Sequence, residues 1–155
     1  MSDTTDVRVQ FQVPGPAVGK RRARVTRTGA YTPQKTKSYE AQVKWWWRTT
    51  GAVYLGEGPI AAYVSVLVSR PKTHMTTKGV LSAEGRRNPH PTRTPDLDNI
   101  CKSILDALNR LAYRDDSQII ELWASRRWCS AGADRTEVTV WRWKDELDDR
   151  PKEAA

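Results

Sequence analysis

The chain has 155 residues, of which 38% are hydrophobic and 28% charged, and its formal net charge is +8. This length suits one domain with its own hydrophobic core, and the composition is that of a folded protein rather than a disordered one. No apolar run approaches the roughly 20 residues that a membrane-spanning helix needs. The polar N-terminus lacks a signal-peptide core, and two cysteines are too few for a disulfide framework, so we expect a cytoplasmic protein.

The charge is unevenly distributed along the chain. Residues 144–155 carry a net charge of −2, which leaves +10 on residues 1–143. Between Pro14 and Arg48, nine lysines or arginines accompany a single acidic residue, Glu40. A basic surface of this kind suits a polyanion such as nucleic acid, although a solvated basic face that only aids solubility would look the same. We expect residues 1–143 to form the domain and the charged segment 144–155 to form a disordered tail.

The first half of the chain predicts a strand, a long connection, a helix and a second strand. Hydrophobic and polar residues alternate over residues 7–13, which indicates a half-buried strand. Glycines, prolines and cations over residues 14–33 indicate a long loop or an irregular hairpin. Aromatic and aliphatic residues recur at helical spacing over residues 35–50, and residues 60–69 alternate again as a strand does.

The second half of the chain predicts a loop, a helix and two strands. Residues 70–95 show no periodicity and predict a functional or mobile loop. An amphipathic pattern predicts a helix from about Asp98 to Leu111, and strands are predicted over residues 118–128 and 136–143. The order β–α–β–α–β–β favours a single two-layer domain of the α/β (α+β) class, in which helices pack on a mixed β-sheet.

Five aspartates fall within the 21 residues from Asp96 to Asp116, in the sequence PDLDNICKSILDALNRLAYRDD. If Asp96 to Asp98 are extended, both carboxylates turn to one side. On the predicted helix, apolar residues form one stripe, while Asp98, Lys102 and Asp106 form a second stripe with an asparagine. Asp116 lies beyond a helix about 20 Å long, so it joins the other aspartates only if the chain folds back.

Carboxylates that are brought together repel one another unless some stay protonated or a cation holds them. Oxygen ligands without a His/Cys set favour magnesium or manganese over zinc. Mg²⁺ typically takes one or two carboxylates together with oxygens of a substrate phosphate. This combination is what metal-assisted hydrolysis of a phosphodiester requires.

Each of these residues also has an ordinary structural explanation. Asp98 is a good N-cap candidate, and Asp106 is expected only to pair with Lys102 or another basic residue of the helix. Asp115 and Asp116 fit the chemistry of a turn before the next strand. A basic structural protein, in which every aspartate is a cap or a turn residue, is therefore an alternative to a metal-dependent nuclease.

At these residues the sequence resembles the RusA family of Holliday-junction resolvases, which are endodeoxyribonucleases of bacteria and phages. The resemblance is carried by PDLDNICKSILDALN and AYRDDSQI, and it extends to VPGPAVGKRRARV, YTPQKT, SYEAQV and SRPKTH. It covers about residues 7–143 and implies a homodimer with a mixed sheet flanked by helices. One departure is Arg110, where many members of the family have glycine.

The resemblance implies a role for several residues. Asp96, Asp98 and Asp116 would bind the divalent metal, which we expect to be Mg²⁺ with Mn²⁺ as a substitute. Lys102 would be the essential lysine, stabilising charge on the phosphate or positioning the attacking water. The residues expected to support the site are Asp115 and Asn99.

The function that the resemblance implies is Mg-dependent cutting of Holliday junctions by paired symmetric nicks, in DNA recombination and repair. Alternatives are a metal nuclease of this fold that acts on other branched or replicating DNA, and a DNA-binding protein without catalysis. We expect no membrane association and no small-molecule cofactor. The residues expected to contact the DNA backbone are Lys20, Arg21, Arg22, Arg24, Arg126 and Arg127.

Overall fold

A computed structural model describes residues 7–22, 24–129 and 132–144 of the chain. Four strands form its main sheet, in the order β1-β6-β4-β5. β4 and β5 run parallel and the other neighbours run antiparallel, so the predicted mixed sheet is confirmed. The four strands are β1 (Arg8–Pro14), β4 (Ile60–Val68), β5 (Ile119–Trp128) and β6 (Arg135–Arg142).

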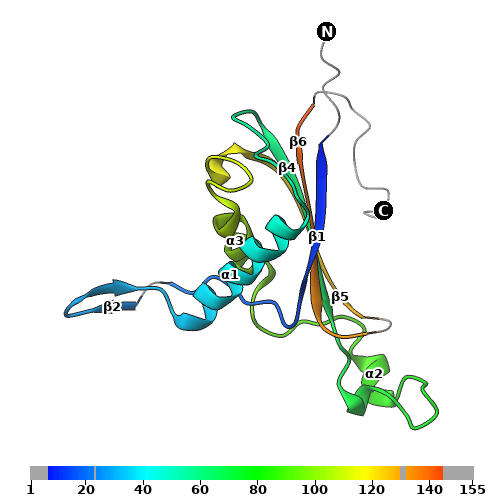
Figure 1. The fold of residues 1–155 in the computed structure, drawn as a ribbon. Helices are drawn as coiled ribbons and strands as arrows, with labels where there is room; N and C mark the ends of the chain where they lie inside the picture. Colours follow the sequence, from blue (N-terminus) through cyan, green and yellow to red (C-terminus); the bar gives the residue numbers. More distant parts are fainter. Residues whose placement is uncertain (1–6, 23, 130–131, 145–155) are drawn as a thin grey trace.

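Two helices cover one face of this sheet (Figure 1), which confirms the predicted two-layer architecture. The helix α1 (Gln34–Thr49) packs against β1, and α3 (Leu97–Leu108) packs against α1 and β5. α3 begins one residue earlier and ends three residues earlier than the predicted helix 98–111. Side chains from both layers fill the core between them, including Val13, Val43, Trp47, Val64, Ile104 and Val138.

The long connection after β1 contains a hairpin, so the hairpin alternative of the prediction is correct. Its strands, β2 (Arg24–Thr26) and β3 (Gly29–Tyr31), pair with each other and not with the main sheet. Figure 1 shows the hairpin projecting away from the body of the protein, next to the start of α1. A projecting element of this kind can reach a large partner.

Residues 70–95 form a folded lobe rather than a structureless loop. The Arg70 guanidinium lies over the Trp128 ring and donates to the Asn88 carbonyl at 3.3 Å. The Trp128 Nε1 donates to the same carbonyl at 2.9 Å, and the buried His74 ring packs edge-on against Trp128. The lobe is therefore fixed to the end of β5. Its short elements, which carry no detectable period, are the turn helix η1 (Lys72–His74) and the helix α2 (Ala83–Arg87).

The predicted tail 144–155 lies outside the described residues except for Lys144. Within the described ranges, no helix is both long and apolar enough to cross a membrane.

Candidate active site

The chain reverses direction after α3 and brings Asp116 back beside it. Arg110 adopts a left-handed backbone conformation with a φ of 61°, which is the region that favours glycine. Its backbone N–H donates to the Tyr113 carbonyl at 2.7 Å. The buried Tyr113 hydroxyl in turn donates to the Leu105 carbonyl of α3 at 2.8 Å. The helix therefore ends in a tight loop that is fastened back onto its own last turns.

Gln118 fixes the turn that carries Asp116. Its side-chain amide donates to the carbonyls of Gly56 and Gly58 at 3.0 and 2.8 Å. Its Oε1 accepts from the backbone N–H of Arg114 at 2.8 Å. These bonds join the turn to a separate loop of the protein, so they set where Asp116 lies at the start of β5.

Asp98, Lys102 and Asp116 line one open pocket of about 440 Å³ beside α3, which we call the acidic pocket. Its remaining walls are mostly apolar and come from α3 and from β5, including Leu122 and Ala124. The folding back of Asp116, which the helix length left open, thus occurs. Two carboxylates and one ammonium group from separate parts of the chain face the same hollow.

The electrostatic environment of Asp116 disfavours its ionised form. Burial, a hydrogen bond with the Asp106 carboxyl and the charge of Asp106 raise the pKa of Asp116, while Lys102 acts in the opposite direction. A raised pKa means that the surroundings do not fully compensate the negative charge of the carboxylate. A cation in the acidic pocket would supply the missing compensation.

Asp106 belongs to an ion-pair network next to the acidic pocket. The Lys102 ammonium lies 3.7 Å from the Asp106 carboxylate, as the helical spacing predicts. The Lys20 ammonium lies 3.0 Å from Asp106 and 2.5 Å from Glu40. Burial works against the charge of Lys20, but its hydrogen bonds to Glu40 and Asp106 raise its pKa overall. The Lys20 ammonium, which the sequence assigns to the DNA backbone, is therefore ion-paired with two carboxylates of the protein, while 25% of the side chain stays exposed.

Asp96 lies in a different hollow from Asp98. Only Asp96 is extended, with φ −67° and ψ 145°, because α3 already begins at Leu97. The condition that Asp96 to Asp98 are all extended is therefore not met, and Asp98 is in the first helical turn rather than at the N-cap. Asp96 shares a pocket of about 500 Å³, which we call the basic pocket, with Lys20, Arg21, Lys35 and Asn99.

The two residues expected to support the site have mainly backbone roles. Asp115 caps the turn helix η2 (Asp116–Gln118), and its carboxylate accepts from the Ser117 N–H at 3.0 Å. Hydrogen bonds from the Ser117 side chain and from its backbone N–H lower the pKa of Asp115. Asn99 lines the basic pocket, and its carbonyl accepts from the backbone N–H of Lys20 at 2.7 Å.

Arg126 and Arg127, which the sequence pairs as DNA contacts, lie on opposite faces of β5. Arg126 donates to the backbone carbonyls of Arg93 and Pro95, directly before Asp96. Arg127 donates instead to the Tyr63 hydroxyl at 3.2 Å, on the face away from the helices. Arg126 thus braces the segment that delivers Asp96, and the structure shows it bound to protein carbonyls.

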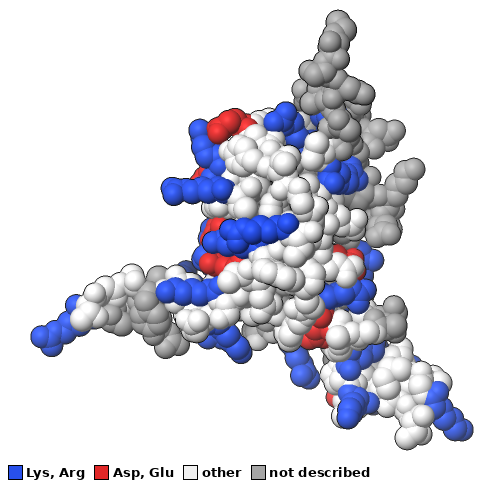
Figure 2. Space-filling model, in the orientation of Figure 1, with Lys and Arg blue, Asp and Glu red and all other residues white. Residues whose placement is uncertain are grey.

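The remaining predicted DNA contacts lie at the hairpin. Arg21 and Arg22 are exposed at its base, and β2 begins at Arg24. Figure 2 shows basic side chains at the hairpin tip and, far from it, on the lobe 70–95. The lobe was not among the predicted contacts, although its six basic residues and one acidic residue, Glu84, were a usable signal. Its exposed basic residues include Lys72, Lys78, Arg86 and Arg87.

The acidic pocket suits a hard divalent cation that shares its ligands with a substrate. In the part of the chain that the structure describes, no three His, Cys, Asp or Glu side chains form a group that could hold a metal ion. Mg²⁺ typically takes only one or two protein carboxylates and completes its shell with water and phosphate oxygens. Asp98 and Asp116 supply two carboxylates in an open pocket, so the residues present fit such an ion.

The comparisons with known proteins place this chain in a family. The family described as "Endodeoxyribonuclease RusA" matches residues 14–141, and the chain belongs to this family. A protein of Bacillus subtilis (strain 168), named "Uncharacterized protein YqaN", is 38% identical over 69 residues. That match covers 44% of this chain and 49% of the relative, so it spans about half the length of each.

Proposed function

We propose that this protein is a divalent-metal-dependent endonuclease that resolves four-way DNA junctions. The observation that carries the proposal is the meeting of Asp98, Lys102 and Asp116 in one pocket of a chain with a net charge of +8. A protein that only binds DNA gains nothing from carboxylates facing the phosphate backbone. Membership of the RusA endodeoxyribonuclease family supports the same reaction.

In this proposal, Asp98 and Asp116 hold Mg²⁺ or Mn²⁺ from two sides of the acidic pocket. Asp96, at the start of α3, would approach the same ion from the side of the basic pocket. When bound, the metal lowers the pKa of a water molecule and neutralises charge on the scissile phosphate. The carboxylates contribute by keeping the ion at a fixed place between two rigid elements, α3 and the start of β5.

Lys102 acts on the phosphate in the proposed reaction. Its side chain is 59% exposed, and its ammonium pairs only loosely with Asp106, at 3.7 Å. It is therefore available to stabilise the negative charge that develops on the phosphate when water attacks phosphorus. The attack breaks the bond from phosphorus to the 3′ oxygen, which leaves a 5′-phosphate and a 3′-hydroxyl.

The proposed substrate binds through its phosphates, at the basic pocket and along the hairpin. Arg21 and Lys35 line the basic pocket beside Asp96, and Arg22 is exposed nearby. Contacts to phosphates supply affinity without sequence preference and make binding sensitive to salt.

We further propose that the protein is a homodimer, because two identical sites related by a two-fold axis can nick two opposed strands symmetrically. Support comes from the edge strand β5, where Ile120 is 55% exposed. Exposed apolar residues on an unpaired strand edge favour association with another chain. Sedimentation equilibrium measures the mass directly, and a monomer at micromolar concentration would contradict the dimer.

A cutting assay on synthetic DNA tests the proposed function. The protein is incubated with a four-way junction or with a linear duplex of the same sequence, in Mg²⁺ or in EDTA. We expect paired symmetric nicks in the junction with Mg²⁺ alone and none in the duplex. Binding without cutting would replace the proposal with a non-catalytic DNA-binding protein, and equal cutting of the duplex would remove the preference for junctions.

A further inference from the structure

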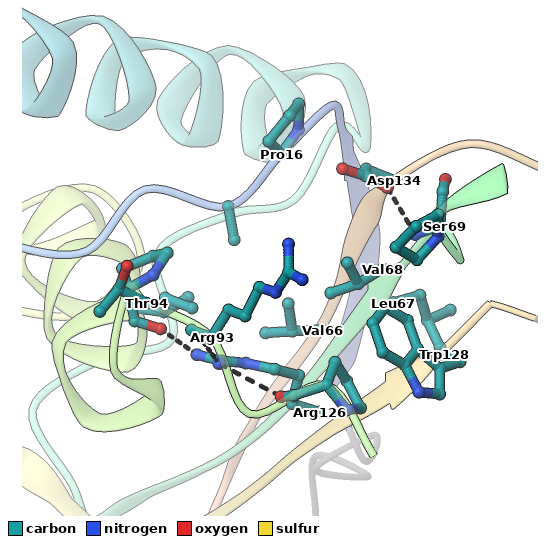
Figure 3. A pocket seen from close by; sticks show the side chains of 15 residues that line it. Pro16, Val66, Leu67, Val68, Ser69, Arg93, Thr94, Arg126, Trp128 and Asp134 are labelled. Carbon is teal, nitrogen blue, oxygen red and sulfur yellow. Dashed lines mark hydrogen bonds between the residues drawn. The ribbon is translucent and has the colours of Figure 1, made fainter. Parts of the chain in front are cut away.

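A third hollow lies beside the segment that leads to Asp96. It is a largely apolar cavity of about 270 Å³, which we call the apolar cavity. Its walls come from β4, from Pro16 and Ala17 after β1, and from residues 91–95 (Figure 3). Ile100 of α3 and Trp128 of β5 complete the lining.

Of the three charged side chains that line this cavity, Arg126 is bound to backbone carbonyls, and the other two supply a donor and an acceptor. Arg93 reaches into it from the 91–95 segment, and Asp134 stands on the opposite side (Figure 3). One oxygen of Asp134 accepts from the Ser69 N–H at 2.6 Å, which fixes the carboxylate and leaves the other oxygen as an acceptor. Among the described residues, the Arg93 guanidinium has no hydrogen-bond or ion-pair partner, so its donors are available to a ligand.

The apolar cavity adjoins the basic pocket, where the proposed substrate would bind. Ala17, Thr94 and Pro95 line both this cavity and the basic pocket that holds Asp96 and Arg21. A strand whose phosphates follow the basic pocket therefore passes the mouth of the cavity. The part of such a strand that can rotate into the cavity, while the phosphates stay in the basic pocket, is a base.

We propose that the apolar cavity receives one unpaired nucleobase of the DNA strand that is cut, an inference that rests on the proposed function. The cavity is slightly smaller than typical small-molecule sites of about 300–1,000 Å³, which suits one base better than a larger ligand. Apolar walls accept the face of any base. Arg93 and Asp134 supply a donor and an acceptor for groups on the base edge.

The structure of a junction lowers the free-energy cost of moving a base out of the helical stack. Extruding a base from a duplex costs a few kcal/mol, and the cost is least where pairing or stacking is already disturbed. At a four-way branch point the helical stack is interrupted, whereas in a linear duplex it is continuous. A base pocket next to the candidate active site would thus favour junctions over duplexes.

Fluorescence of 2-aminopurine tests the inference without any cutting. The base analogue is placed at each position beside the branch point, or in an arm as a control, and binding is measured in EDTA. Ala17→Leu narrows the cavity from its rim, while Ala41→Leu makes the same change on the exposed face of α1. Arg93→Ala removes the guanidinium and leaves the walls intact.

With the wild-type protein and with Ala41→Leu, we expect the fluorescence to rise severalfold at one branch-point position and not in the arm. With Ala17→Leu the rise disappears, and with Arg93→Ala it is reduced. Junction binding and cutting without any rise would overturn the base pocket and leave the proposed function standing. A rise that persists in Ala17→Leu would also overturn the base pocket. Failure of the wild-type protein to bind junctions would overturn both the base pocket and the proposed function.

Discussion

The acidic pocket and the basic pocket adjoin the same end of α3 but differ in chemistry. The acidic pocket holds Asp98 and Asp116 with one lysine, whereas the basic pocket holds Asp96 among Lys20, Arg21 and Lys35. Two aspartates separated by one leucine thus line pockets of different composition. The difference suggests that the acidic pocket binds a cation and the basic pocket binds phosphate. The segment from Asp96 to Asp98 separates the two pockets.

Replacing Asp96 or Asp98 with asparagine should have the largest effects on cutting. Asp98→Asn and Asp96→Asn should each abolish cutting in Mg²⁺, because each removes a proposed metal ligand. In EDTA, Asp96→Asn should bind the junction more tightly than Asp98→Asn does, since it removes a negative charge from a pocket of cations. Gel-shift titrations in EDTA measure this. Equal affinities would mean that the two pockets do not differ as described.

Replacing Lys102 with alanine should slow cutting by about 10²–10³-fold. This is the usual loss when one preorganised group that stabilises the charge of a transition state is removed. Affinity for the junction should change little, because one exposed lysine contributes only a small part of phosphate binding. Single-turnover rates at saturating protein separate the two quantities. Lys37→Ala, on the exposed side of α1, is the matched control, and an equal loss there would assign the effect to general charge.

Arg126→Ala should act on the metal site through the 91–95 segment. Loss of the bonds to the carbonyls before Asp96 should raise the Mg²⁺ concentration needed for half-maximal cutting by about 10–100-fold, as for other groups that orient ligands. Arg127→Ala, on the opposite face of β5, should leave that concentration unchanged. If Arg126→Ala instead weakened junction binding at unchanged metal dependence, Arg126 would be a DNA contact as the sequence predicts.

Removing Arg21 and Arg22 together should weaken junction binding and leave the maximal cutting rate intact. The slope of log affinity against log salt should become less steep by about 0.9 for each phosphate contact that is lost. Fluorescence anisotropy over a range of salt concentrations provides the slope. An unchanged slope would show that the base of the hairpin does not touch the DNA backbone.

The smallest effect concerns stability in the absence of metal. Because the pKa of Asp116 is raised in the folded protein, ionising this group above its unfolded pKa costs stability. Asp116→Asn should therefore raise the melting temperature slightly at pH 7 in EDTA, and the gain should vanish as the pH falls and the wild-type carboxyl takes up its proton. Mg²⁺ should stabilise the wild type but not the variant. A variant that melts lower at every pH would contradict the destabilising effect of the ionised Asp116 carboxylate.

Much of the fold could be predicted because hydrophobic periodicity decides it locally. The strands β1 and β4 and the helices α1 and α3 follow directly from alternation or helical spacing. The lobe 70–95 could not be predicted, since its elements are too short to show a period and depend on packing against Trp128. The early end of α3 depends on the left-handed conformation of Arg110, at the position where the family resemblance expects glycine.

The site was predictable in its residue types but not in its geometry. The motif indicates Asp96, Asp98, Lys102 and Asp116, yet a helix that starts one residue earlier than predicted sends the first two aspartates into different pockets. The roles of Lys20 and Arg126 depend on contacts with residues distant in the sequence. Such long-range pairings have no periodic signature, so the sequence does not show which basic residues are paired with other groups of the protein.

The central claim is that Asp98 and Asp116 hold one divalent cation in the acidic pocket. Anomalous diffraction from crystals grown with Mn²⁺ tests it most directly, because the signal locates the ion without reference to activity. We predict one peak per chain in contact with both carboxylates, and its loss in Asp116→Asn. A peak elsewhere, or none at a saturating Mn²⁺ concentration, would contradict the account.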